Sequence, residues 1–262
     1  MIRRTNMVAR QAENWRPPAF TVSKGGLGSF IAVLRRLLDL QTASIWADLS
    51  RVLPTATGTV LDVGCGAQPF RSLLPPAVRY IGIDTVDAKA NFGYEVPDTV
   101  YFEGSVWPVA DGSIDFVLCT EVFEHVADSH AFLAEMFRCL APGAQVVLTV
   151  PFSARWHYIP YDYWRFTPAS LNNLFSEAGF MDIAVYARGN ALTVACYKLN
   201  ALILPLLMPQ GKGFAASLLL RLAGFLVSPI FLLSLLIAHL SLRGLGGDDC
   251  LGYTLIARKT RN

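Results

Sequence analysis

An apolar run that stops at two glycines is the feature that most restricts how this chain can fold. Residues 60–70 read VLDVGCGAQPF, in which Gly64 and Gly66 flank Cys65 and a single acid, Asp62, lies inside the apolar run. A buried strand that ends in such a turn is typical of the carboxyl edge of a parallel sheet, where glycines let a ligand approach the backbone. The segment therefore predicts an α/β protein with a ligand site directly after its first strand.

Strand-like and helix-like segments alternate along the rest of the chain. Thr167 is a predicted helix N-cap, Pro168 takes the first helical position, and Gly179 follows the helix end. This alternation predicts a doubly wound, mostly parallel sheet of seven strands with helices on both faces. The predicted strands are 59–64, 79–86, 99–106, 113–122, 145–152, 181–188 and 251–259, and the predicted helices are 27–53 (one or two), 69–77, 129–140 and 167–178.

A long apolar stretch, residues 191–242, lies between the sixth and seventh predicted strands and carries three formal charges. Because both of its ends return to one sheet, it crosses a bilayer an even number of times or not at all. Residues 222–242 form an uncharged run of 21, close to the ~20 that a membrane span needs. Residues 199–211 are too few for a straight span and contain two prolines. We expect a helical hairpin that dips into one leaflet; a soluble helical subdomain or a dimer interface is the alternative.

Composition excludes several classes of protein. The net charge of +2 gives no strong field, so we expect no nucleic-acid partner. The five cysteines are scattered without CxxC pairs, which predicts neither a disulfide framework nor a zinc cluster and favours a reducing compartment. The first arginines are not followed by an apolar run, so we expect no secretory signal and a cytoplasmic location for most of the chain.

Spacing after the glycine turn decides between ligands. A dinucleotide fingerprint starting at Gly64 needs a third glycine at position 69, which is Pro69 here. The motifs VLDVGCG, YIGID, DGSIDFVLCTEVFEHV and LAPGAQVVLTVPF occur in this order. Together they resemble the class I S-adenosylmethionine-dependent methyltransferases, in the branch that modifies small molecules. The resemblance covers residues 53–188 and 251–259, and one departure is Gln68, where many relatives have a glycine.

The resemblance implies a Rossmann-like methyltransferase fold with four segments along the chain. Residues 1–53 are an N-terminal segment with amphipathic helices, and residues 54–190 are the core that binds S-adenosylmethionine. Residues 191–245 are the hydrophobic helical insertion, and residues 246–262 return as the final strand of the core.

The resemblance also implies which residues bind the cofactor. The loop after the first strand would hold the methionine part, Asp84 the ribose hydroxyls and Glu103 the adenine edge, with Trp107 beside the ring. Asp84 as a turn residue and Glu103 as a solvated acid are the alternatives. The residues assigned to cofactor binding are Asp62, Gly64, Cys65, Gly66, Asp84, Glu103, Ser105, Val106, Cys119 and Thr120.

Two histidines are candidates for removing a proton from the methyl acceptor. His125 lies just beyond the fourth strand, and imidazole titrates near neutral pH. His157 lies in an aromatic segment, 151–171, which is a candidate acceptor wall or lid. A histidine bonded within the helix start is the alternative for His125. Glu121, Glu124 and His125 resemble the divalent-metal site of ubiquinone-pathway O-methyltransferases, but we expect no metal, since Glu-His at this turn is widespread among relatives without one.

The sequence therefore predicts a methyltransferase that acts on a hydroxyl, less readily a nitrogen or carbon, of a lipid-soluble or lipid-linked small molecule. Residues 199–242 would bring it to the cytoplasmic face of a membrane as a peripheral or monotopic protein. Two alternatives stay open. One is a methyltransferase for a soluble substrate whose insertion forms a dimer, and the other is a scaffold that binds S-adenosylmethionine without catalysis.

Overall fold

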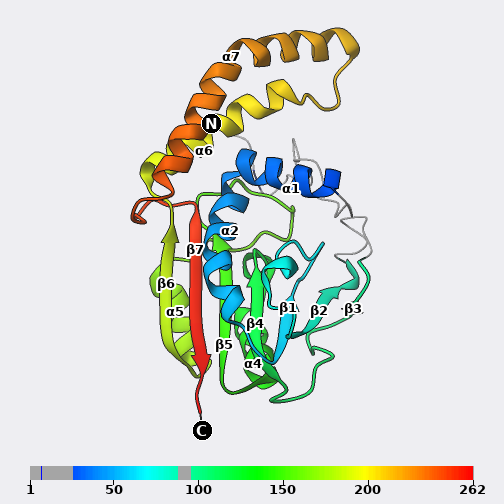
Figure 1. The fold of residues 1–262 in the computed structure, drawn as a ribbon, viewed down its shortest axis with the longest axis vertical. Helices are drawn as coiled ribbons and strands as arrows, with labels where there is room; N and C mark the ends of the chain where they lie inside the picture. The colour runs from blue at the N-terminus through cyan, green and yellow to red at the C-terminus, as the bar shows by residue number, and fades with distance from the viewer. Residues whose placement is uncertain (1–6, 8–25, 88–95, 262) are drawn as a thin grey trace.

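A seven-stranded sheet forms the centre of the protein (Figure 1). The computed structural model describes residues 7, 26–87 and 96–261, so most of the predicted N-terminal segment before residue 26 lies outside the described residues. The sheet order is β3-β2-β1-β4-β5-β7-β6. The strands are β1 (Thr59–Val63), β2 (Arg79–Thr85), β3 (Thr99–Phe102), β4 (Ile114–Thr120), β5 (Leu140–Pro151), β6 (Phe180–Arg188) and β7 (Gly252–Lys259).

The sheet is parallel except for β7, the last strand in the sequence. β1 pairs in parallel with both β2 and β4, and β4 pairs in parallel with β5. β7 inserts between β5 and β6 and runs antiparallel to both of them. The predicted mostly parallel seven-stranded sheet is confirmed.

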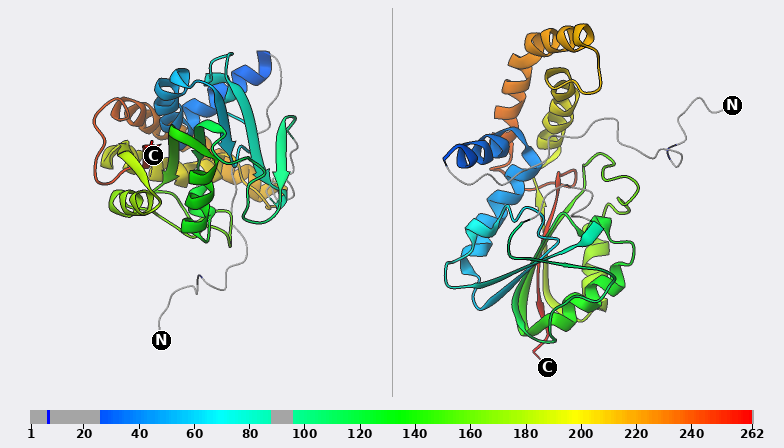
Figure 2. Two further views of the ribbon diagram at one scale, coloured as in Figure 1. Left: turned by 90° about the horizontal axis from the view of Figure 1, so that it is seen from below. Right: turned by 90° about the vertical axis from the view of Figure 1, so that its right-hand side faces the viewer.

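Helices cover both faces of this sheet (Figure 2, right). One face packs against α4 (Ser129–Cys139) and α5 (Pro168–Glu177), and the other packs against α2 (Leu40–Val52). Successive side chains of β4 alternate between the two faces: Val117 packs in the core beneath α4 and α5, and Phe116 packs in the core beneath α2. A strand buried on both faces has to be apolar almost throughout, which is why β4 reads IDFVLCT.

Local signals account for the helix ends. Thr167 caps α5 and Pro168 lies in its first turn, as the sequence predicts, and Ser170 completes a capping box with Thr167. Asp39 caps α2 and thereby separates it from α1 (Gly26–Leu38), so residues 27–53 form two helices. Gly179 follows α5 with a φ of +92°, a conformation that glycine adopts without strain.

The helix predicted at residues 69–77 is not present. A single 3-10 turn, η3 (Arg71–Leu73), follows the glycine turn, and Leu74 is already extended where Pro75 and Pro76 begin. The residue before a proline is pushed out of the α region, so the prolines end the turn. A helix dipole after β1 is therefore not available to attract an anionic part of a ligand.

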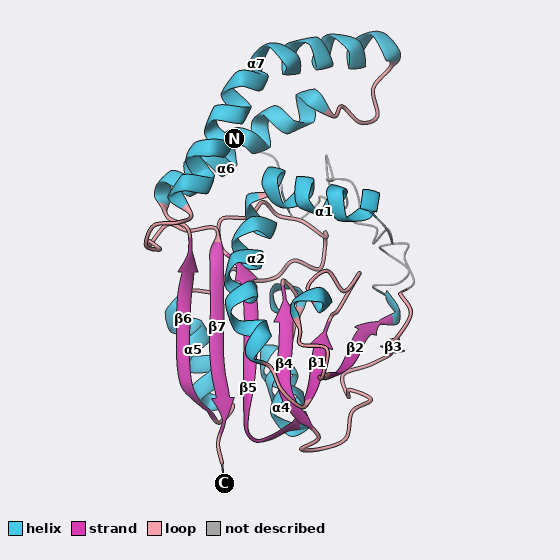
Figure 3. Ribbon diagram, viewed as in Figure 1, coloured by secondary structure: helices cyan, strands magenta, loops and turns pink. Residues whose placement is uncertain are grey.

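The apolar insertion forms a helical hairpin of α6 (Ala191–Leu207) and α7 (Phe214–Ser241), which stands off one end of the sheet (Figure 3). A hydroxyl of Thr193 lies 2.8 Å from that of Ser241, which joins the two helices at the base. Higher up, the Ser234 hydroxyl donates to the Asn200 side chain. A Cβ at Gly224 would lie 3.0 Å from α6 backbone, so glycine permits the close approach of the helices.

Candidate active site

The glycine turn lies at the carboxyl edge of the sheet, held by the end of β2. The amides of Gly64 and Cys65 both donate to the carbonyl of Ile83, at 2.9 and 3.1 Å. The amide of Gly66 donates to Oδ2 of Asp84 at 2.9 Å. The backbone amides of the turn after β1 are therefore hydrogen-bonded to the end of β2.

The glycine turn packs closely against Val122, which follows β4. Gly64 has a φ of +66°, and a Cβ there would lie 2.4 Å from Cγ2 of Val122. Gln68, which replaces the glycine of many relatives, takes a positive φ of +54° and is kept there by hydrogen bonds to Thr99 and Arg71. The departure at position 68 therefore leaves the turn tight.

Asp62 is buried, and its hydrogen-bond partner comes from the neighbouring strand β2 and not from the adjacent loop. Tyr80 donates its hydroxyl to Oδ2 of Asp62 at 2.8 Å, whereas the loop amides go to Ile83 and Asp84. Burial, only partly offset by this bond, raises the pKa of Asp62 to about 7. Sequence reasoning missed Tyr80. The alternation of side chains along β2 could have indicated this contact. Asp62 pairs with Gly82, and Tyr80, two residues before Gly82, points to the same face of the sheet as Asp62.

Asp84 lies at the end of β2, where the resemblance places the ribose-binding acid. Its two carboxylate oxygens accept from the amides of Gly66 and Thr85, and its side chain is mostly buried. Burial raises the pKa of this carboxyl, and the two amides oppose the rise. Asp84 therefore shapes the turn as well as offering oxygens at its rim.

The residues after β3 form the open side of the site. Glu103, Ser105 and Val106 are exposed, and a Cβ at Gly104 would meet no described atom within 4 Å. The Trp107 side chain, which was expected beside the adenine ring, is not part of this open surface. Its ring is buried in the core, edge-on to Phe132, and its backbone amide donates a hydrogen bond to Glu135.

Two further predicted cofactor residues end β4 next to the glycine turn. Cys119 pairs with Val63, so the ends of β1 and β4 are adjacent. The Cys119 side chain is enclosed in the core and has no exposed surface, whereas Thr120 is partly exposed. The Cys119 thiol therefore contributes packing at this edge.

Glu121, Glu124 and His125, which resemble a metal site in sequence, do not form one cluster of ligand atoms in the described part of the chain. Glu121 turns to Arg188 at the end of β6, where Oε1 accepts from the guanidinium at 2.7 Å. Arg188 is almost fully buried and also donates to Ser44 and to the carbonyl of Val150. The sequence analysis did not identify Arg188. A single basic residue at the buried end of a strand indicates that an acidic partner lies nearby, because a buried charge has to be paired.

His157 takes the place of Glu121 beside the other two residues. Glu124 and His125 lie in the 3-10 turn η4 (Phe123–His125), and His157 comes from the aromatic segment after β5. The Glu124 Oε1 atom lies 3.6 Å from Nε2 of His125 and 4.0 Å from Nε2 of His157. The structure therefore brings the two histidines together, with ring centroids 4.9 Å apart.

Surrounding groups fix both rings and the acid. Nδ1 of His125 lies 3.0 Å from the carbonyl of Tyr161. Burial, reinforced by the neighbouring His157, lowers the pKa of His125 to about 4. Burial raises the pKa of Glu124 well above its ordinary value. The backbone amide of His157 donates to Oδ2 of Asp162, and Nδ1 of His157 lies beside the same oxygen. The Arg165 guanidinium donates to both carboxylate oxygens of Asp162.

The residues at the edge fit S-adenosylmethionine. The turn carries no side chain at Gly64 or Gly66, Asp84 offers a two-oxygen acceptor at the end of β2, and the surface around Gly104 is open beside an exposed acid. The fold and this edge define a Rossmann-like domain of the class I methyltransferase type.

The chain belongs to the methyltransferase-domain family, whose sequence model matches residues 34–185. An uncharacterized methyltransferase of Mycobacteroides abscessus is 35% identical over 100 residues, which cover 35% of this chain and 39% of that protein. A protein of Mycolicibacterium smegmatis described as a probable S-adenosylmethionine-dependent methyltransferase is 31% identical over 136 residues, covering 46% of this chain and 51% of that one. The chain thus spans about half or less of these relatives' length.

Solved structures show the same fold. A SAM-dependent methyltransferase from Archaeoglobus fulgidus aligns with a TM-score of 0.52 at 17% identity, covering 88% of this chain and 100% of that one. A Haemonchus contortus phosphoethanolamine N-methyltransferase, solved with S-adenosylhomocysteine, aligns with a TM-score of 0.50 at 16% identity, covering 84% and 52%. This is an S-adenosylmethionine-dependent methyltransferase domain, and the hairpin is its apolar insertion between the last two strands.

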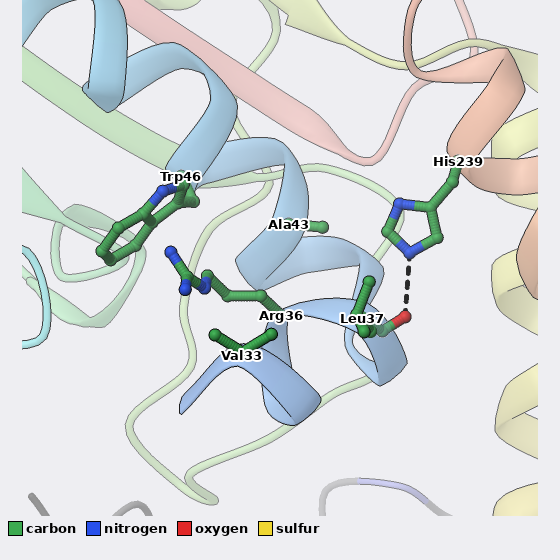
Figure 4. Close-up of a pocket in the computed structure, with 6 residues that line it drawn as sticks. All are labelled: Val33, Arg36, Leu37, Ala43, Trp46 and His239. Carbon is green, nitrogen blue, oxygen red and sulfur yellow. Dashed lines mark hydrogen bonds between the residues drawn. The ribbon is translucent and has the colours of Figure 1, made fainter. Parts of the chain in front are cut away.

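An open hollow of about 310 Å³ lies where the hairpin meets the core, between α1, α2 and α7 (Figure 4). Arg36 stacks over the Trp46 ring at 4.0 Å, and Nε2 of His239 lies 2.8 Å from the carbonyl of Leu37. The residues that line this hollow include none of the predicted cofactor or catalytic residues. It belongs to the junction between the insertion and the core.

Proposed function

We propose that this protein transfers the methyl group of S-adenosylmethionine to a hydroxyl of a lipid-soluble or lipid-linked small molecule at the cytoplasmic face of a membrane. One observation carries the proposal: the apolar hairpin and the candidate site share one edge of the sheet. The predicted cofactor residues other than Cys119 would then have the roles that the family resemblance implies.

The shared edge follows from strand direction. β6 and β5 both run antiparallel to β7, so β6 ends at the same edge as β1 and β4. The hairpin begins directly after β6 and returns into the start of β7. Figure 1 shows the hairpin beyond the edge of the sheet where β1 and β4 end, and the glycine turn and His125 directly follow these two strands.

The hairpin exposes the apolar surface that a bilayer would cover. α7 is the one described helix long and apolar enough, by length and composition, to cross a membrane, and 22% of its most apolar window is buried. Phe214, Phe225 and Leu226 are each more than 70% exposed. Soluble monomers rarely expose a contiguous apolar patch of this kind. Burial of each such side chain would contribute about 1.5–3 kcal/mol.

Helix α1 supports the same orientation. It lies along the sheet edge below the hairpin (Figure 3) and exposes Phe30, Ile31 and Leu37. Its last turn carries Arg35 and Arg36. Apolar side chains combined with basic residues are typical of helices that lie in the interface of an anionic membrane.

Methyl transfer from a sulfonium is an in-line displacement, so the protein mainly orients the two reactants and excludes water. A hydroxyl acceptor also has to lose its proton. We assign His125 and His157 to that activation, because their Nε2 atoms converge beside Glu124 and their Nδ1 atoms are already held by Tyr161 and Asp162. The aromatic segment that carries His157 would form the acceptor wall.

Labelling tests the reaction. Membrane extract incubated with the protein and methyl-labelled S-adenosylmethionine should yield a labelled, organic-soluble product, identified by mass spectrometry. The Asp84→Ala variant should yield much less. Label found only in water-soluble products would refute the lipid acceptor, and no label in any fraction would favour a scaffold without catalysis.

Vesicle flotation tests the membrane contact. The protein should float with anionic phospholipid vesicles, and Phe225→Ser with Leu226→Ser should reduce the floated fraction strongly. Met181→Ser, which changes an exposed apolar residue at the opposite end of β6, is the matched control and should float normally. Recovery of the unmodified protein as a stable dimer in detergent-free supernatant would overturn the membrane proposal in favour of a dimerising insertion.

A further inference from the structure

Three potential ligand atoms converge beside the predicted cofactor edge. Glu124, His125 and His157 each offer one atom, and these atoms all lie within 4.8 Å of one another. Two imidazoles and one carboxylate at this spacing can share a single cation, since metal–ligand bonds of about 2.0–2.2 Å place ligand atoms some 3–4 Å apart.

Both imidazoles are already oriented for such a role. The Nδ1 atom of His125 lies 3.0 Å from the carbonyl of Tyr161, and that of His157 lies 3.1 Å from Oδ2 of Asp162. Each ring therefore directs Nε2 toward Glu124. Histidines that ligate metals almost always bind a carboxylate or a carbonyl through their other nitrogen, which fixes tautomer and ring orientation.

The carboxylate supplies an independent observation. The Glu124 side chain is fully buried, and neither oxygen accepts a hydrogen bond from the described residues. The backbone that carries it is fixed, because the Glu124 carbonyl accepts from the amides of Tyr163 and Trp164. A buried acid without donors is costly unless a cation neutralises it or it keeps its proton.

We propose that Glu124, His125 and His157 bind one divalent transition-metal ion of the zinc class. The inference rests on the proposed function and names how the two histidines would activate the acceptor. Nitrogen ligands outnumber the single oxygen ligand, which favours zinc or cobalt over magnesium or calcium. Three protein ligands leave a coordination position for the acceptor hydroxyl.

The metal would act on the acceptor before the methyl group moves. A bound hydroxyl has a lowered pKa and releases its proton to solvent. The oxygen then uses a lone pair to form the new O–C bond, while the sulfur keeps the electron pair of the broken S–C bond. Sulfonium becomes neutral thioether, and alkoxide becomes ether, so charge and atoms balance.

The ligand set differs from the one that the sequence motif suggests. Glu121 is engaged with Arg188, and His157 comes from a segment more than thirty residues further along the chain. The two sets make different predictions. Glu121→Gln should keep the metal affinity, whereas His157→Gln should lose it.

Metal binding can be measured without the methyl acceptor. The full-length protein, stripped with a chelator, should bind one equivalent of Zn²⁺ in titration calorimetry and should give a tetrahedral Co²⁺ absorption band. Glu124→Gln and His157→Gln should each weaken Zn²⁺ binding more than about 100-fold, since loss of an outer partner alone costs about 10–100-fold. His130→Gln is the control, because His130 also pairs with a glutamate, Glu177, but on the surface.

Binding of S-adenosylmethionine by each variant reports whether the domain is folded. A folded Glu124→Gln protein that binds Zn²⁺ like the unmodified protein would overturn the proposal and identify Glu124 as a buried neutral acid. The absence of stoichiometric Zn²⁺ or Co²⁺ binding would also overturn it, whereas labelled product formed after chelation would leave the proposed function standing. Tight zinc binding without methyl transfer would support the site and count against the proposed function.

Discussion

The glycine turn makes a quantitative prediction at Gly64. In Gly64→Ala, the new Cβ lies 2.4 Å from Cγ2 of Val122, and the backbone stays at a φ of +66°. We expect two separate costs. The left-handed conformation costs about 1–2 kcal/mol for a residue with a Cβ, and the overlap costs about 1–3 kcal/mol. The free energy of unfolding should fall by the sum, about 2–5 kcal/mol.

A double-mutant cycle separates the two costs. Val122→Ala removes the methyl groups that the new Cβ meets, so the double variant should recover the overlap cost and keep the conformational one. Gly104→Ala is the matched control, because Gly104 has a φ of +84° and an added Cβ would meet no described atom within 4 Å. It should cost only the conformational part.

Urea unfolding of the four proteins, followed by circular dichroism, gives the coupling energy directly. We expect at least 1 kcal/mol of recovery in the double variant, because substitutions at independent sites add to within about 0.3–0.5 kcal/mol. If the effects of Gly64→Ala and Val122→Ala simply add, the turn is not limited by its contact with β4 and the reasoning fails.

Three further predictions test the edge of the sheet. Glu121→Ala leaves the buried Arg188 without its acid and should lower the free energy of unfolding by about 3 kcal/mol, measured in urea; no loss would mean that the pair is not formed. Because the pKa of Asp62 rises from 3.8 to about 7 on folding, the folded state holds a proton that the unfolded chain releases, and stability should fall by up to about 4 kcal/mol as pH rises through that window. Asp62→Asn should flatten this pH profile, and an unchanged slope would contradict the assignment. Asp84→Ala should weaken S-adenosylmethionine binding by about 1.5–3 kcal/mol in calorimetry, whereas equal affinity would exclude Asp84 from the ribose site.

Local patterns were enough to predict most of the fold. Apolar runs bounded by Gly, Pro and polar residues mark each strand, and the single motif order sets their arrangement. The prediction failed where tertiary context outweighs local preference. Residues 69–77 contain helix formers, yet the prolines at 75 and 76 limit them to one 3-10 turn. Trp107 was expected beside the adenine ring, but its ring is buried in the core against Phe132 and its backbone amide donates a hydrogen bond to Glu135.

The candidate site could be predicted only in part, because its contacts join distant segments. The glycine turn and Asp84 are close in sequence and follow from one motif. The approach of His157 to Glu124 depends on the path of the aromatic segment, which Asp162 and Arg165 fix after folding. No periodicity in the sequence could indicate that Glu121 would turn away from Glu124.

The base of the hairpin has a consequence for substrate choice. Asn190 caps α6 and also accepts from Ser241 of α7, so both stems are fastened to the end of β6 within a few residues. In the proposed arrangement, the distance between the reacting methyl group and the lipid headgroups is set by the protein and does not vary. Acceptors would then be sorted by the height at which their hydroxyl stands above the bilayer, and a spacer a few atoms too short or too long would suffice for rejection.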